Sequence, residues 1–149
     1  MFAGIEIWTV GHSDRSAAEL FDLLRAAGVQ VVVDVRRAPW SRRHPWHARA
    51  ELERFLVARG VDYRWMGAAL GGELDHDFDA RRKTDEYREA LEELLRLAGA
   101  KRTAVMCAER DHRHCHRQFI ADDLAARGAI VRHLIEPGLT ECHQPPLSF

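Results

Sequence analysis

Reactive side chains crowd into one short stretch, between an apolar run ending at Cys107 and a helical pattern starting at Cys115. Cys115 is followed by His116 and Arg117, and a thiol at a helix N-terminus beside cationic groups deprotonates more readily. We therefore expect Cys115 or Cys107 to act as nucleophile, with Glu109 and His116 completing the catalytic groups. Arg117 and the N–H groups of the helix start would bind an anion. For Cys107 a purely apolar role stays open, because buried cysteine often serves only as a small apolar residue.

A second group of functional side chains follows the β-branched run 29–35. Four arginines fall within eight residues there: Arg36, Arg37, Arg42 and Arg43. Asp34 ends the run, and a buried carboxylate is costly unless paired, so Arg36 is its expected partner. Arginine forks suit phosphate or carboxylate, Ser41 adds a hydroxyl group, and Trp40 and Trp46 offer stacking surfaces. The loop predicts a small anionic or phosphorylated ligand, and a solvated basic loop with one ion pair is the alternative.

Two further loops carry smaller signals. Gly11 permits a tight turn, His12 is a candidate proton carrier near pH 7, and Ser13 lies beside it as a ligand-binding candidate. Gly71 and Gly72 would let the backbone approach a ligand closely, although a plain turn explains them equally well. We expect His133 to be structural.

A metal site is the competing use of the same side chains. The available ligands are Cys107, Glu109, His112, His114, Cys115 and His116. Two cysteines eight positions apart, the second followed by histidine, match no standard zinc spacing. We assign no metal ligands and no cofactor, and a metal-binding domain remains an alternative.

These loops must be positioned by regularly alternating elements. Hydrophobic patterns predict strands over 5–10, 29–35, 61–65, 103–107 and 129–135, and helices over 16–27, 48–59, 85–98 and 115–127. Strands alternating with helices predict one three-layer αβα domain over 1–136, with a mostly parallel sheet of about five strands. The third strand is more polar and is expected near an edge. Residues 67–83 are expected to be irregular, and 137–149 to be a surface tail. The loops that leave the strands hold the reactive side chains, so the ligand site is predicted at the carboxyl edge.

Composition narrows the classes of function. The chain has 149 residues and a formal net charge of −1, so no global attraction to nucleic acid or to anionic membranes is expected. No apolar stretch approaches the roughly 20 residues of a membrane span. We see no leader peptide, and three cysteines do not suggest a secreted disulfide framework, so a cytoplasmic location is expected. Nucleic acid as a partner has only weak support.

Taken together, the motifs resemble a known prokaryotic family. They are Thr9-Val10-Gly11-His12-Ser13, Asp34-Val35-Arg36 with Pro39 and Ser41, Tyr63 with Leu70-Gly71-Gly72, Met106-Cys107-Ala108-Glu109, Cys115-His116-Arg117 with Ala121-Asp122, and His133. In this order the chain resembles the family catalogued as domain of unknown function 488. The resemblance implies a small α/β fold and a cytoplasmic prokaryotic protein, and it supplies no reaction.

The leading hypothesis is an enzyme with an anion-binding Cys/His/Arg site that acts on a phosphorylated or nucleotide-like substrate. A metal-binding domain and a non-catalytic module for nucleic acid or a protein partner are the two alternatives.

Overall fold

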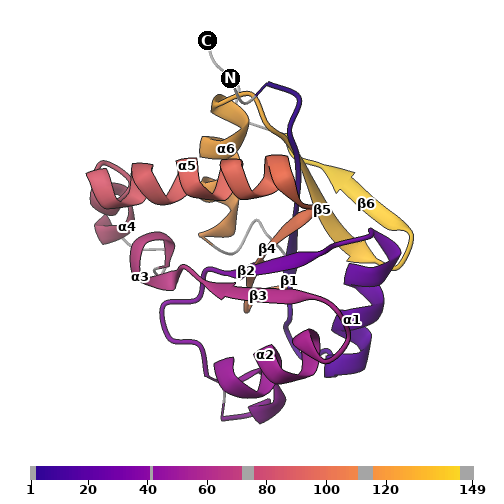
Figure 1. Ribbon diagram of the computed structural model, residues 1–149. Helices are drawn as coiled ribbons and strands as arrows, with labels where there is room; N and C mark the ends of the chain where they lie inside the picture. Colours follow the sequence, from indigo (N-terminus) through magenta and orange to yellow (C-terminus); the bar gives the residue numbers. More distant parts are fainter. Residues whose placement is uncertain (1–2, 41, 72–75, 111–115, 145–149) are drawn as a thin grey trace.

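A six-stranded sheet with helices on both faces gives the chain three layers (Figure 1). The computed structural model describes residues 3–40, 42–71, 76–110 and 116–144. The strands are β1 (Glu6–Gly11), β2 (Val31–Asp34), β3 (Asp62–Trp65), β4 (Thr103–Cys107), β5 (Ile130–Glu136) and β6 (Leu139–Cys142). The α-helices are α1 (Ala17–Ala26), α2 (Arg49–Val57), α3 (Gly67–Leu70), α4 (His76–Arg81), α5 (Asp85–Ala100) and α6 (Arg117–Ala126), and Pro45–His47 form the 3-10 helix η1.

Five of the six strands are parallel. The order across the sheet is β3-β2-β4-β1-β5-β6, and among the strands that the structure describes only the pairing of β6 with β5 is antiparallel. The interior strands β2 and β4 are buried along their whole length, because helices cover both faces of the sheet. The parallel strands bring their carboxyl ends to one edge, where an open α/β sheet binds its ligands.

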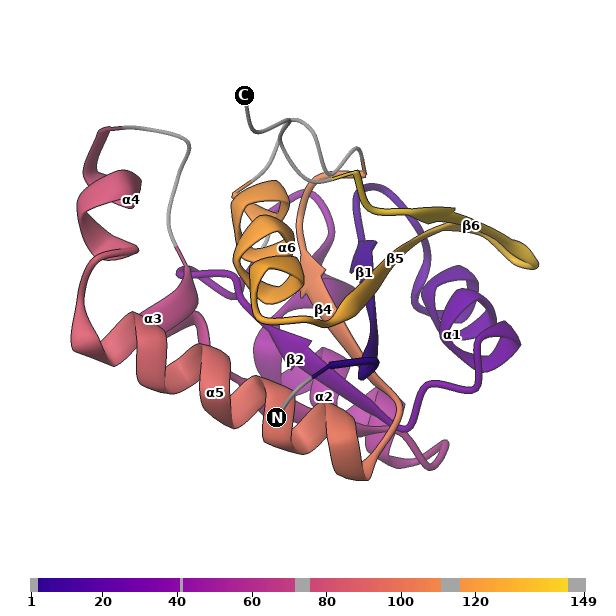
Figure 2. The ribbon, with the colours of Figure 1, turned by 90° about the horizontal axis from the view of Figure 1, so that it is seen from above.

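Alternate residues of each strand enter two separate cores. Val33 and Val105 pack with α5 and α6, whereas Val32 and Ala104 pack with α1 and α2 on the opposite face. Figure 1 shows α5 and α6 above strands β2 and β3 and α2 below them, and Figure 2, turned by 90°, shows α6 and α1 on opposite sides of β5. Successive side chains of a strand point to opposite faces of the sheet. A shift of one residue along the strand therefore moves a functional group to the other face.

The expected α/β fold is confirmed, and all nine predicted strands and helices are present with ends shifted by at most two residues. The start of α1 illustrates why. The Ser16 hydroxyl accepts a hydrogen bond from the Glu19 N–H at 3.0 Å, and the Glu19 carboxylate accepts from the Ser16 N–H at 2.9 Å. This reciprocal capping can be read from the spacing of the two residues. The polar strand β3 lies at the edge, as expected.

Two segments differ from expectation. The part expected as a surface tail contains β6, which follows a turn at Gly138 (φ +81°) and leaves its four residues exposed at the edge of the sheet. A short polar strand carries little sequence signal, because its stability comes from pairing with β5. The segment expected to be irregular contains α3 and α4, and α4 is held by buried Phe78 against the ring of Tyr87.

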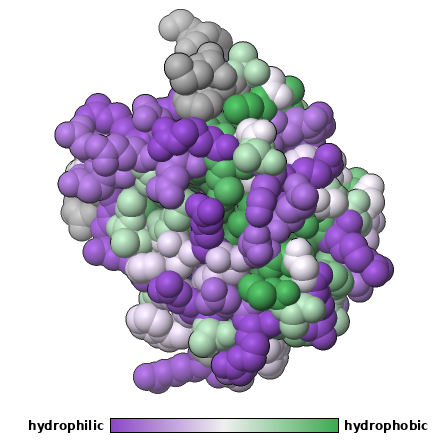
Figure 3. Space-filling model, viewed as in Figure 1, coloured by the Kyte–Doolittle hydropathy of each residue, from purple (hydrophilic) through white to green (hydrophobic). Residues whose placement is uncertain are grey.

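The outer surface is largely polar where helices face the solvent. Hydrophilic side chains cover most of α4 and α5 in the view of Figure 3, and smaller apolar areas lie between them. No helix within the described ranges combines the length and the apolar character needed to cross a membrane.

Candidate functional site at the carboxyl edge of the sheet

The loops after β1 and β4 stay hydrogen-bonded to each other beyond the ends of the two strands. The His12 N–H donates to the Cys107 carbonyl at 2.9 Å, and the Ser13 N–H donates to the Ala108 carbonyl at 2.8 Å. Ser13 has φ +46°, a left-handed conformation that costs a residue other than glycine roughly 1–2 kcal/mol. The loop after β1 is therefore held in one defined conformation against the loop after β4.

Close backbone contact explains the glycines of these loops. A Cβ atom at Gly11 would lie 1.7 Å from the Glu109 carbonyl oxygen. A Cβ atom at Gly71 would lie 2.4 Å from the Gly67 oxygen and 2.7 Å from the Arg37 nitrogen. The close approach that the sequence predicts at Gly71 is thus made by the backbone of the chain itself.

The predicted pair of Asp34 and Arg36 is confirmed at the end of β2. Asp34 is fully buried and accepts hydrogen bonds from the Arg36 Nε at 2.9 Å, the Arg36 Nη2 at 2.7 Å and the Arg36 backbone N–H at 3.0 Å. The Tyr63 hydroxyl donates a fourth. Burial, and then the adjacent Asp34 charge, raises the pKa of Tyr63 above its ordinary value. Burial alone would lower the pKa of Arg36, but its hydrogen bonds and charge interaction with Asp34 outweigh this and raise it.

Arg36 also fixes the tautomer of His12. Its Nη1 lies 3.2 Å from the His12 Nε2, and a guanidinium group can only donate. Nε2 therefore carries the lone pair, and the Nδ1–H donates to the Ser13 carbonyl at 3.0 Å. Burial, followed by the neighbouring His47 and Arg36, lowers the pKa of His12 to about 3. At pH 7 His12 is neutral with its lone pair engaged, so the proton-carrying role predicted for it requires Arg36 to withdraw.

His47 is a second buried imidazole of this cluster. Its ring centroid is 4.2 Å from that of His12. Its Nε2 lies 2.6 Å from the Arg15 carbonyl oxygen and 3.0 Å from the Trp46 Nε1, and the shorter contact assigns the proton to Nε2, which donates to the carbonyl. The indole N–H of Trp46 donates to the same carbonyl at 2.9 Å. Burial is the largest of the effects that lower the pKa of His47 to about 4. Its Nδ1 accepts no hydrogen bond from any residue that the structure describes.

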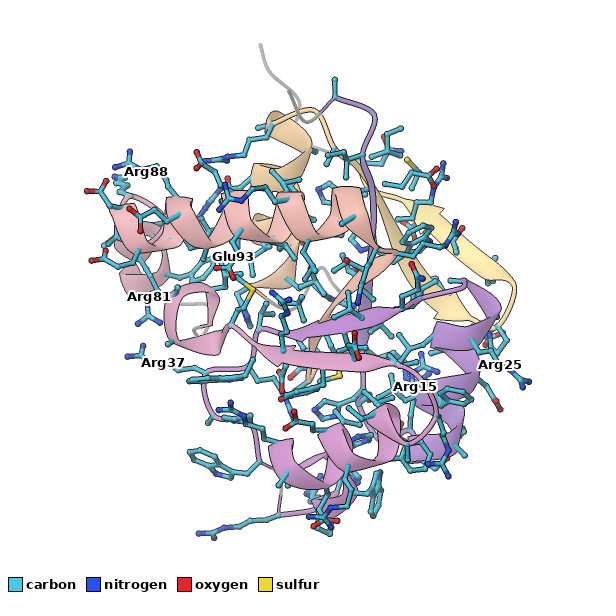
Figure 4. All side chains as sticks on the ribbon, viewed as in Figure 1. Arg15, Arg25, Arg37, Arg81, Arg88 and Glu93 are labelled. Atoms are coloured by element: carbon cyan, nitrogen blue, oxygen red, sulfur yellow. The ribbon has the colours of Figure 1, made fainter. Side chains whose placement is uncertain are left out.

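The basic loop, residues 35–50, includes His47 and supplies Arg36 to His12. It contains five arginines, two histidines and no carboxylate. The predicted ligand-binding residues Arg42 and Arg43 are exposed, as is Arg37, and Trp40 is 68% exposed. Arg81 of α4 adds charge here, because it donates a hydrogen bond to the Gly71 carbonyl beside the Arg37 backbone. Figure 4 shows Arg37 and Arg81 leaving the fold at the same end of the sheet, next to α3.

The other predicted site residues lie around the start of α6. Cys107 is fully buried, with its Sγ 3.6 Å from the Glu109 carbonyl oxygen, and the Glu109 side chain is exposed. The His116 Nε2 lies 3.3 Å from the Val35 carbonyl, to which it donates. Arg117 is 1% exposed, and its Nη2 donates to the carbonyls of Glu109 and Arg110 at 3.3 and 3.1 Å. In this structure Arg117 holds the loop after β4, and its predicted contact with an anion stays a prediction.

The sheet divides the predicted site into two parts. Asp34, like its register partner Met106, lies on the α1/α2 side, and so does the cluster it forms with Arg36 and His12. Cys107 is packed on the α5/α6 side. The sequence predicts a common edge for these side chains but not this separation, which depends on the position of each within its strand.

Some predicted site residues cannot be placed. Ser41, Gly72 and Cys115 lie outside the described residues. So do His112 and His114, on which the metal hypothesis also depends. Within the described part of the chain, no group of three or more His, Cys, Asp or Glu side chains is arranged to hold a metal ion.

His47 and Tyr63 were missed as site residues by sequence reasoning. His47 was recognisable only as one of the two histidines within the basic loop. Tyr63 was recognisable as part of a polar edge strand and as one of the motif residues of the family resemblance, without a role. Their contacts link residues 32 and 29 positions apart, and such contacts leave no local pattern.

Comparison with known proteins gives one match. No curated protein and no solved structure shows significant similarity to the chain. A family model described as domain of unknown function DUF488 matches residues 16–124, which covers most of the sequence. The chain therefore belongs to the DUF488 family.

Proposed function

We propose that this chain is an enzyme that binds a phosphorylated, nucleotide-like substrate at the carboxyl edge, on the α1/α2 side of the sheet. The observation that carries the proposal is the basic loop, which has five arginines and no carboxylate in a chain of net charge −1. One of these arginines, Arg36, is neutralised by Asp34. Arg37, Arg42 and Arg43 remain exposed and in position to bind an anion.

Exposed aromatic side chains support a ligand that carries a base as well as phosphate. Trp40 is 68% exposed and Trp46 is 39% exposed, and both lie within the basic loop. Large exposed aromatic residues between arginines are typical of surfaces that stack bases and bind the attached phosphates. The Trp46 indole N–H is bonded to the Arg15 carbonyl, which fixes the orientation of this ring.

The buried imidazoles support a chemical role in addition to binding. His47 is neutral at pH 7 and its Nδ1 lone pair has no partner among the described residues, so it can accept a proton from a substrate or from a water molecule. A phosphate placed beside it would raise its pKa toward neutrality, because an adjacent negative charge favours the imidazolium form. His47 thus suits the role of general base better than His12, whose lone pair faces Arg36.

The test is a binding titration with ATP as the probe. Tryptophan fluorescence or calorimetry measures the affinity at several salt concentrations. Arg42→Ala with Arg43→Ala should weaken binding at least roughly tenfold, because each lost charged hydrogen bond is worth about 1.5–3 kcal/mol. The control is Arg25→Ala with Arg96→Ala, which removes two exposed arginines on α1 and α5 and should leave affinity unchanged.

Equal affinity in the two double variants would refute the proposed site. Turnover of bound ATP is followed by phosphorus NMR in the wild type and in His47→Gln. Turnover lost in His47→Gln while binding is retained supports the enzyme. Binding without any turnover, or tighter binding of a single-stranded oligonucleotide than of ATP, would instead support a non-catalytic nucleic-acid module and overturn the enzymatic part.

A further inference from the structure

A chain of four hydrogen-bonded side chains crosses the α5/α6 side of the sheet. The Thr9 Oγ1 on β1 lies 2.5 Å from the Nδ1 of His133 on β5. The His133 Nε2 lies 2.8 Å from the Nδ1 of His143, which follows β6. The His143 Nε2 lies 2.6 Å from a carboxylate oxygen of Asp122 on α6. We call these residues the Thr9 relay, and Thr9, His133 and His143 are all buried.

When both imidazoles are neutral, the carboxylate at one end sets the direction of every hydrogen bond in the relay. An ionised Asp122 can only accept, so His143 must carry its proton on Nε2. The His143 Nδ1 then holds a lone pair and accepts from the His133 Nε2–H. This leaves a lone pair on the His133 Nδ1, which accepts the proton of the Thr9 hydroxyl. With both imidazoles neutral, the three hydrogen bonds have one consistent arrangement, in which the Thr9 oxygen is the polarised end.

We propose that the Thr9 relay is a second chemical site, in which Thr9 is a nucleophile toward an electrophilic acyl or phosphoryl centre. A hydroxyl bonded to a base that is itself oriented by a third group is the arrangement by which proteins activate Ser and Thr. His133 is the base, and His143 and Asp122 are positioning residues. His133 is thus assigned a chemical role in place of the structural one expected from the sequence.

The proposed step conserves atoms and charge. The Thr9 Oγ1 forms a bond to the electrophilic carbon or phosphorus atom while the bond to the leaving group breaks. The hydroxyl proton passes to the His133 Nδ1, and the His133 Nε2 proton passes to the His143 Nδ1. The positive charge then resides on His143, beside the Asp122 carboxylate. A water molecule then bonds to the carbon or phosphorus atom while the bond to the Thr9 Oγ1 breaks. The His143 proton returns through His133 to the Thr9 oxygen, one water proton stays on the acid product and the other is released.

The second imidazole has a physical purpose in this arrangement. An imidazolium ion in a buried site is costly unless an anion lies beside it. Transfer through His143 places the charge 2.6 Å from a carboxylate oxygen, where a charged hydrogen bond stabilises it. Thr9 itself is 1% exposed, so a labelling experiment reports directly whether an electrophile reaches its hydroxyl group.

The position of Thr9 connects the relay to the carboxyl edge. Thr9 is paired in register with Val105 and His133, and the next residues on its face are Gly11 and its partner Cys107 at the strand ends. The relay lies on the opposite face of the sheet from the Asp34–Arg36–His12 cluster. It therefore stands independently of the proposed ATP site.

The test uses diisopropyl fluorophosphate, a small phosphoryl electrophile with fluoride as the leaving group, on the full-length protein. Intact mass and peptide mapping should show one adduct on Thr9, and mapping distinguishes it from reaction at any of the three cysteines. Thr9→Val should abolish the adduct. Asp122→Asn should slow labelling roughly 100-fold or more, because an amide can donate to His143 and reverse its tautomer.

The matched control is Asp22→Asn on α1, which removes the same charge away from the relay and should label at the wild-type rate. Nitrogen-15 NMR of the imidazoles shows whether both histidines carry their protons on Nε2, and whether Asp122→Asn changes this. Absence of an adduct on Thr9 in the folded wild-type protein overturns the proposal, even if the NMR tautomers are as deduced. Equal labelling rates in Asp122→Asn and Asp22→Asn also overturn it.

Discussion

Replacing Arg36 by methionine should destabilise the protein more than any exposed arginine replacement. The substitution keeps most of the side-chain volume but removes the Nε and Nη2 donors of Asp34 and the Nη1 donor of His12. Asp34 is fully buried and would retain only the backbone N–H of residue 36 and the Tyr63 hydroxyl. Removal of one partner of a buried ion pair leaves an uncompensated charge and costs about 3–5 kcal/mol.

The loss of stability in Arg36→Met can be measured by urea unfolding at pH 7 and by thermal melting. At about 2–4 °C per kcal/mol for a chain of this size, the melting temperature should fall by roughly 6–20 °C. Arg54→Met is the control, because Arg54 is 71% exposed and its pair with Glu51 at 3.3 Å should contribute only about 0–1 kcal/mol. Adding Asp34→Asn to Arg36→Met should restore part of the loss, since the buried charge is then absent. If Arg36→Met costs no more than Arg54→Met, the reasoning about the buried pair is refuted.

Two further predictions concern the same edge. The pKa of His47 is lowered from 6.5 to about 4, so between these values the unfolded chain holds the extra proton. Stability should therefore fall as pH is lowered from 6.5 toward 4, by up to about 1.4 kcal/mol per pH unit. Denaturant titrations at several pH values should show that the free energy of unfolding depends less steeply on pH in His47→Gln than in the wild type. An unchanged slope would contradict the lowered pKa of His47. Gly11→Ala should cost about 1–3 kcal/mol or more, because its Cβ would overlap the Glu109 carbonyl, whereas Gly99→Ala on α5 meets only ordinary contact at 3.5 Å and should be neutral or stabilising. Similar melting temperatures for the two glycine variants would show that the loops after β1 and β4 do not pack as described.

Features that depend on neighbouring residues were predicted from the sequence. Helix α1 begins where the Ser16–Glu19 spacing places it, and the helices α1 and α6 are followed by glycines with positive φ at Gly28 and Gly128. The pair of Asp34 and Arg36 was also predictable, because its partners are two positions apart and the carboxylate ends a buried apolar run. The carboxyl edge followed from the alternation of strands and helices.

Features that depend on distant residues were not predicted. Tyr63 reaches Asp34 only because β3 pairs with β2 in a particular register, and His47 reaches Arg15 across 32 positions. The Thr9 relay joins β1, β5, α6 and the segment after β6. Sequence reasoning placed β6 and His143 in a surface tail.

The sequence by itself determined the αβα class, the order of the elements and the edge at which the reactive side chains gather, because periodicity and capping are local properties. Tertiary structure decided which of these side chains meet. The strand register and the two-residue alternation place His12, Arg36 and Asp34 on one face, and Thr9, His133 and Cys107 on the other. The single polar edge expected from the sequence is therefore two clusters, separated by the sheet that carries both.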